Sequence, residues 1–101
     1  RPASVHEVRL ERVSLRERSE FVLARLSVSR RMDFESLFPE EATRLEIIVT
    51  FLAMLELMKM HAIHAEQGEQ FGSIVIALAV EDVSEVRFEG LDEYEHAAEK
   101  E

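Results

Sequence analysis

The segment Thr43–Met60, TRLEIIVTFLAMLELMKM, carries apolar side chains on almost every side of a helix. Thr43 and Glu46 have the spacing of a capping box, which begins a helix. Stepping 100° per residue from Leu45 gives two apolar stripes, although a helix packed on a small core needs only one. A chain of 101 residues forms one small domain, so this helix must either be wrapped on two sides or meet a partner.

The two stripes predict different surroundings. The first, which we expect to close the core, consists of Leu45, Val49, Leu52 and Ala53. The second, which we expect to be covered by a partner, consists of Ile47, Phe51, Met54, Leu55 and Met58. Burying four such side chains is worth on the order of 6–12 kcal/mol as an upper bound, against about 5–15 kcal/mol for a whole domain. Full internal burial is the alternative, and the polar arc of Thr43, Glu46 and Thr50 is expected to face solvent.

An earlier helix is predicted to begin at Ser14, because Glu17 follows it at capping-box spacing, and to end in the polar run 27–31. Residues 32–34 are a short strand or a turn. Residues 35–38 form a single helical turn that Pro39 stops.

Two apolar runs, 62–67 and 71–79, flank a turn around Gly68 and predict a β-hairpin. The order of elements predicts an α+β fold, a winged helix with a three-helix head and a two-stranded β wing. We expect an N-terminal linker end at 1–12, the winged-helix domain at 13–80 and an acidic C-terminal tail at 81–101. Whether that tail is ordered is left open by its composition.

The charge distribution argues against a general binder of nucleic acid. The net charge is −9, yet residues 1–31 hold eight arginines and four glutamates, so a basic arm precedes an acidic body. Affinity for phosphate backbones comes from Lys and Arg, and the body has only four of these against seventeen acidic side chains. The longest apolar run, Ile47–Leu55, is far shorter than the roughly 20 residues of a membrane span, and no signal core precedes it. The missing initiator Met predicts a fragment or processed chain, and the cytoplasm is the expected location.

A set of motifs resembles a known family. The run Phe34–Phe38, then Arg44 and Glu46, then Val49–Leu57, then Gln67 and Phe71–Ile74 give the pattern TFLA-x-LEL…Q…FG-x-I. This pattern resembles segregation and condensation protein A, the bacterial kleisin, and specifically its C-terminal winged-helix domain.

The resemblance implies a non-catalytic role in chromosome segregation and condensation at the nucleoid. In that family the C-terminal winged helix docks on the ATPase head of an SMC protein. A middle segment, expected to be absent here, recruits segregation and condensation protein B. For this chain, the residues expected to bind the partner are Arg44, Ile47, Phe51, Met54, Leu55, Met58, Lys59 and Phe71.

Three other kinds of function agree less well with the sequence. A DNA-binding winged helix reads bases with Arg, Lys, Asn or Gln on its long helix, and here the expected polar arc has none of them. His61, His64 and Glu66 lie at a junction between helix and strand, so we expect solvated side chains rather than a metal site. No phosphate cradle or nucleophile–base set is visible, and the chain has no cysteine, so no enzyme activity and no cofactor are expected.

Overall fold

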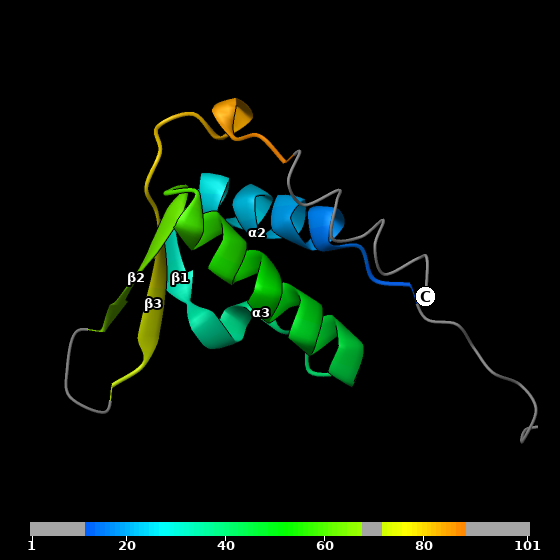
Figure 1. The fold of residues 1–101 in the computed structure, drawn as a ribbon. Coiled ribbons are helices and arrows are strands. Elements are labelled where there is room, and N and C mark those ends of the chain that lie inside the picture. Colours follow the sequence, from blue (N-terminus) through cyan, green and yellow to red (C-terminus); the bar gives the residue numbers. More distant parts are fainter. Residues whose placement is uncertain (1–11, 68–71, 89–101) are drawn as a thin grey trace, which may run out of the picture.

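The computed structural model describes residues 12–67 and 72–88. These residues form an α+β domain of two α-helices, short 3-10 turns and a three-stranded sheet (Figure 1). The elements are, in order, α2 (Leu15–Ser29), β1 (Arg31–Asp33), η1 (Phe34–Leu37), α3 (Arg44–Lys59), β2 (Ile63–Gln67), β3 (Ile74–Leu78) and η2 (Val83–Glu85).

Both α-helices begin at the capping residues that their sequences predict. The Ser14 side chain accepts a hydrogen bond from the backbone N–H of Glu17 at 3.0 Å. At α3 the capping box is complete, because Thr43 Oγ1 accepts from the Glu46 N–H at 3.1 Å and Glu46 Oε1 accepts from the Thr43 N–H at 2.9 Å. The predicted starts of both helices are therefore confirmed.

Replacing Thr43 by alanine is expected to cost about 0.5–2 kcal/mol of unfolding free energy, since it removes the oxygen that satisfies the Glu46 N–H. Urea unfolding measures the change. Ser73→Ala, at an exposed position between β2 and β3, is the control and should stay within about 0.5 kcal/mol of the wild type. Equal effects of the two substitutions would contradict a stabilising role for the cap.

The sheet is antiparallel, and its strand order β1-β3-β2 places β3 in the centre. The predicted hairpin is confirmed, with Ala65 opposite Ile76 in the β2–β3 register. The segment predicted as a short strand or a turn is a strand: β1 pairs with the other edge of β3, places Met32 opposite Ile76 and adds a third strand to the two of the predicted wing. A strand of three residues suffices there, since pairing removes an open edge from the most apolar strand.

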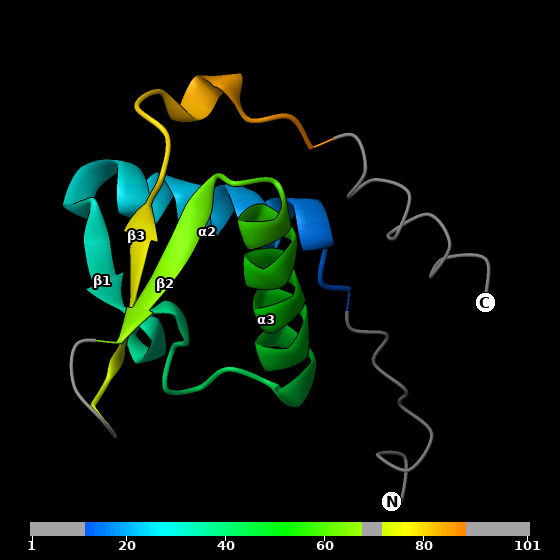
Figure 2. The same ribbon diagram turned by 60° about the vertical axis from the view of Figure 1, so that its left-hand side comes forward.

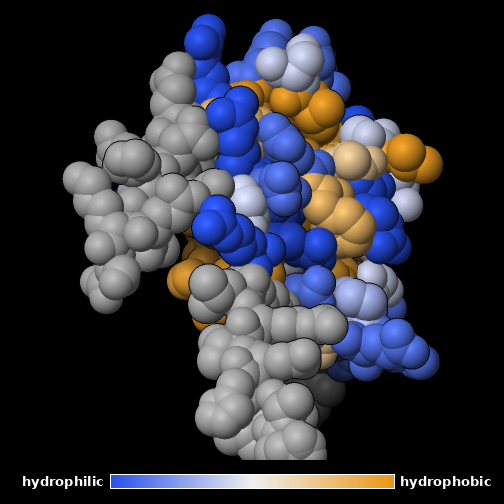
Figure 3. Space-filling view, turned by 90° about the vertical axis from the view of Figure 1, so that its right-hand side faces the viewer, coloured by the Kyte–Doolittle hydropathy of each residue, from blue (hydrophilic) through white to orange (hydrophobic). Residues whose placement is uncertain are grey.

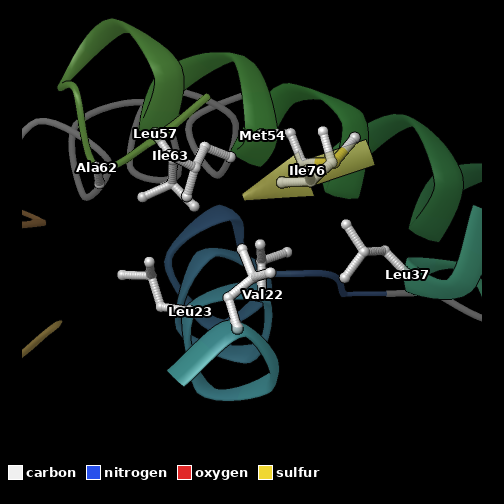
Figure 4. Close-up of a cluster of buried hydrophobic side chains, with 9 residues drawn as sticks. Val22, Leu23, Leu37, Met54, Leu57, Ala62, Ile63 and Ile76 are labelled. Carbon is white, nitrogen blue, oxygen red and sulfur yellow. The ribbon is translucent and has the colours of Figure 1, made fainter. Parts of the chain in front are cut away.

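The core lies where α2, α3 and one face of the sheet meet, with η1 closing one end (Figure 2). Side chains from each of these elements point into it (Figure 4). Its buried members are Val22, Leu23, Leu26, Leu37, Met54, Leu57, Ala62, Ile63 and Ile76.

The orientation of α3 about its own axis differs from the prediction. Leu45 and Leu52, expected in the core, are exposed, with 46% of Leu52 accessible to solvent. Met54, expected at the partner, is buried at 1%. The buried face instead consists of Thr50, Ala53, Met54 and Leu57.

A polar contact explains this orientation. Arg18 Nε on α2 donates a hydrogen bond to Thr50 Oγ1 at 2.8 Å, so the hydroxyl expected in solvent is fully buried with its partner. Thr50 and Ala53 are also small, and small side chains let two helices approach closely. Large side chains such as Leu52 are consequently turned outward.

After the sheet, the chain returns to the helices. Asp82 caps η2 by accepting hydrogen bonds from the Ser84 N–H at 3.0 Å and the Ser84 hydroxyl at 2.7 Å. These bonds lower the pKa of Asp82. Phe88 then packs against the small cluster of Leu15 and Ala53. The linker end 1–12, apart from Arg12, and most of the acidic tail lie outside the described residues, and the domain boundaries stay predictions.

Candidate functional site

An apolar groove of about 550 Å³ lies between α3 and η1. It is built from side chains that two elements hold side by side, and Glu35 is the single charged residue among those that line it. Its apolar lining is Phe34, Phe38, Ile47, Ile48, Phe51 and Leu52. We call this feature the apolar groove.

Three aromatic rings shape the groove. The rings of Phe34 and Phe38 are 5.1 Å apart at 67°, and those of Phe34 and Phe51 are 6.2 Å apart at 89°. Both are edge-to-face arrangements, which aromatic pairs favour. Phe34 and Phe38 also pack against the buried core, so they fix one wall of the groove before any partner arrives.

The α3 side of the groove is unusually open to water. Ile47, Ile48, Phe51 and Leu52 are each between 43% and 48% exposed. Single exposed apolar residues are common, but a contiguous set on one helix marks a surface for interaction. The face drawn in Figure 3 likewise shows hydrophobic side chains between strongly hydrophilic ones.

The structure sorts the predicted partner residues into groups. Ile47 and Phe51 line the groove, while Leu55 is exposed on α3 but does not line it. Met58 is half-buried against the core and Met54 is buried, so neither presents a free surface.

The remaining predicted partner residues lie at the margins. Arg44 and Lys59 are exposed at the two ends of α3, and Phe71 lies outside the described residues. Sequence reasoning missed Phe34, Phe38, Ile48 and Leu52 as lining residues. The spacing of Phe34 and Phe38 beside Pro39 was the available signal for the first two.

The solvent face of the sheet carries a paired charge cluster. The Arg31 guanidinium on β1 makes an ion pair with the Glu66 carboxylate on β2, diagonally across β3, where Arg31 is opposite Ala77 and Glu66 is opposite Val75. His64 Nε2 lies 2.7 Å from the other Glu66 oxygen. The hydrogen bond to His64, followed by that to Arg31, lowers the pKa of Glu66 and keeps it ionised. His64 is thus held by a carboxylate of its own strand.

The rest of the described surface offers little chemistry. Within residues 12–67 and 72–88, no three His, Cys, Asp or Glu side chains are grouped so that they could hold a metal ion. No helix in these ranges has the length and apolar character needed to cross a membrane. The apolar groove is therefore the feature that calls for a functional explanation.

The family model and the known proteins that match this chain carry the same family name. Residues 2–79 match the family model described as "Segregation and condensation protein ScpA". Segregation and condensation protein A of Myxococcus xanthus is 44% identical over 77 residues, which cover 74% of this chain and 27% of the relative. The protein of the same name from Listeria monocytogenes is 40% identical over 76 residues, covering 73% and 30%. That from Halalkalibacterium halodurans is 44% identical over 70 residues, covering 68% and 26%. The chain thus spans less than a third of the length of these relatives.

Proposed function

Because the chain belongs to the segregation and condensation protein A family, we propose that it acts in chromosome segregation and condensation by docking on the ATPase head of an SMC protein. In this proposal it is a non-catalytic domain of a kleisin. The observation that carries the proposal is the apolar groove, whose aromatic wall and half-exposed α3 side chains lie on an otherwise acidic protein.

The groove has the composition of an interface core. Such cores are enriched in aromatic and large aliphatic side chains, and charges gather at the rim. Phe51 supplies an aromatic anchor between Ile47 and Ile48, while Arg44 and Lys59 mark the two ends of the helix. The partner surface is expected to present complementary apolar side chains with acidic residues around them.

We also propose that the domain is a winged helix and the C-terminal domain of the longer protein. The order of α2, η1 and α3 followed by the β2–β3 hairpin supports this reading, with β1 as the third strand of the sheet. In the full-length protein, another segment would bind segregation and condensation protein B. The expected setting is the cytoplasm at the nucleoid.

The surface of α3 argues against the alternative hypothesis that the domain is a DNA-binding winged helix. The exposed side chains along the middle of α3 are apolar, and its exposed basic groups are confined to Arg44 and Lys59 at the ends. Apolar side chains cannot form the bidentate hydrogen bonds that distinguish base pairs. The described part of the hairpin, residues 63–67 and 72–78, has no Lys or Arg to contact a phosphate.

Titrations of the chain against an isolated SMC head and against duplex DNA test the proposal. The head should bind at a defined stoichiometry, and its affinity should change little between 50 and 200 mM salt, since apolar burial dominates. Binding to DNA through several phosphate contacts would instead lose roughly 10³-fold or more in affinity over that range. Tight, strongly salt-dependent DNA binding together with no binding to the head would overturn the proposal.

A further inference from the structure

Three side chains on one side of α2 form a compact cationic surface. Arg18, Phe21 and Arg25 follow one another at intervals of three and four residues, which places them on one face of the helix. The guanidinium carbon of Arg18 lies 4.3 Å from the centre of the Phe21 ring, and that of Arg25 lies 5.7 Å from it. Both are cation–π contacts. We call these three residues the cationic stripe.

Contacts to two other elements fix the positions of both cations. Arg18 Nε donates a hydrogen bond to Thr50 Oγ1 on α3 at 2.8 Å, and Arg25 Nη1 donates a longer one to the carbonyl oxygen of Ser36 in η1 at 3.5 Å. Phe21 packs against the buried core. A guanidinium has several N–H groups, and each of these bonds uses one of them. The other N–H groups are therefore available to a ligand, on cations that the fold has already positioned.

The cationic stripe lacks the carboxylates that accompany other arginines of this protein. Arg16 pairs with Glu20, and Arg31 pairs with Glu66. Within residues 12–67 and 72–88, no Asp or Glu side chain makes an ion pair with either guanidinium of the stripe. The chain has twenty-one acidic and twelve basic side chains, so a shortage of carboxylates does not explain this.

We infer that the cationic stripe is a second docking surface, which binds an acidic segment of a protein partner. The two cation–π distances share the centre of one ring, so the guanidinium carbons are at most about 10 Å apart. That separation fits two carboxylates carried by residues two to four positions apart in one segment. An arginine can hold each carboxylate through two parallel N–H···O bonds.

The charge of the whole chain favours an acidic protein segment over DNA as the ligand. A net charge of −9 opposes the approach of a long polyanion, whereas a protein partner can carry a few acidic residues on a surface that is otherwise basic. None of the three residues of the stripe lines the apolar groove. The inference therefore stands or falls independently of docking on an SMC head.

Titration with a peptide of seven glutamates tests the inference. NMR signals of the arginine Nε–H groups report on each guanidinium separately. The signals of Arg18 and Arg25 should shift with a Kd on the order of 1 mM at low salt, and binding should weaken as salt screens the charges. The signals of the exposed Arg30 and Arg87 should shift much less. A peptide of seven glutamines should leave all four signals in place.

A pair of matched variants separates the stripe from general charge attraction. Arg25→Gln should weaken binding of the glutamate peptide about three- to tenfold, because one of the two cations is lost. Arg87→Gln removes the same charge from an exposed position after η2 and should leave the affinity within about twofold of the unmodified chain. Thermal melts check that both variants are folded. Equal weakening by the two substitutions would overturn the inference, as would unshifted Arg18 and Arg25 signals at about 10 mM peptide.

Two further measurements test the ring and the class of ligand. Phe21→Leu keeps both charges and most of the apolar packing, and it should weaken peptide binding about two- to fivefold because the guanidinium groups are no longer held together. An unchanged affinity would contradict the stripe as a preformed site. A twelve-base-pair DNA duplex should bind more weakly than the glutamate peptide at equal concentration of negative charge. Tighter binding of the duplex would overturn the inference and identify phosphate as the ligand.

Discussion

Phe51→Ala is expected to weaken binding to an SMC head by at least about 2 kcal/mol, roughly thirtyfold in Kd, with little change in thermal stability. Phe51 is half-exposed in the free domain, so the ring loses water contact mainly when a partner covers it. It also stands edge-to-face with Phe34, and truncation opens the centre of the groove rather than its margin. Isothermal titration against the head measures the loss.

Val28→Ala is the matched control for this experiment. Val28 on α2 is 83% exposed and does not line the groove, so its truncation removes exposed apolar surface elsewhere. Its affinity for the head should equal that of the unmodified domain. If Phe51→Ala binds the head as tightly as Val28→Ala does, the head docks on another surface. If Phe51→Ala unfolds the domain, Phe51 is a core residue, which contradicts the hypothesis that it acts as an anchor in the apolar groove.

Leu57→Ala is expected to lower the free energy of unfolding by about 2–5 kcal/mol, because Leu57 is fully buried at the centre of the core. Its neighbours come from α2 and the sheet as well as α3, so the cavity would be enclosed on several sides (Figure 4). For a domain of this size, such a loss corresponds to a drop in Tm of roughly 10 °C or more.

Leu52→Ala on the same helix provides the comparison. Leu52 is 46% exposed, so its truncation should cost about 1 kcal/mol or less. Urea unfolding measures the free energy of unfolding of both variants. The two values can be compared directly, because both substitutions replace a leucine by an alanine. A larger loss of unfolding free energy for Leu52→Ala than for Leu57→Ala would contradict this orientation of α3 and support the core stripe that the helical wheel predicts.

Local signals in the sequence predicted the elements well. The capping residues Ser14 and Thr43 fixed both helix starts, because each side chain satisfies a specific backbone N–H nearby in sequence. The hairpin followed from two apolar runs around Gly68. Such features depend on neighbours a few residues apart, which a sequence displays directly.

The orientation of α3 depends on a distant residue and was predicted incorrectly. The wheel placed Thr50 in solvent because it is polar, whereas Arg18, thirty-two residues earlier, supplies its hydrogen bond in the interior. A polar residue with a satisfied partner can be buried, and no local pattern reveals that partner. The same rotation turned Leu52 outward and placed Met54 and Met58, two of the eight predicted partner residues, against the core.

The groove itself could be predicted only on its α3 side. Ile47 and Phe51 followed from the second apolar stripe, but Phe34 and Phe38 belong to a short 3-10 turn whose position depends on tertiary packing. The strand β1 was ambiguous for a related reason. Three residues carry too little pattern to distinguish a strand from a turn, and their pairing with β3 is a long-range contact.

The contact of Phe88 with Leu15 also has a mechanical consequence. The first turn of α2 and the last described residue touch, so the polypeptide enters and leaves the domain at one place. Tension applied to the chain from both sides would act first across this junction, peeling Phe88 away from α2. Under force, the segment that ends at Phe88 would therefore extend first, and the groove would be deformed only after that contact had separated.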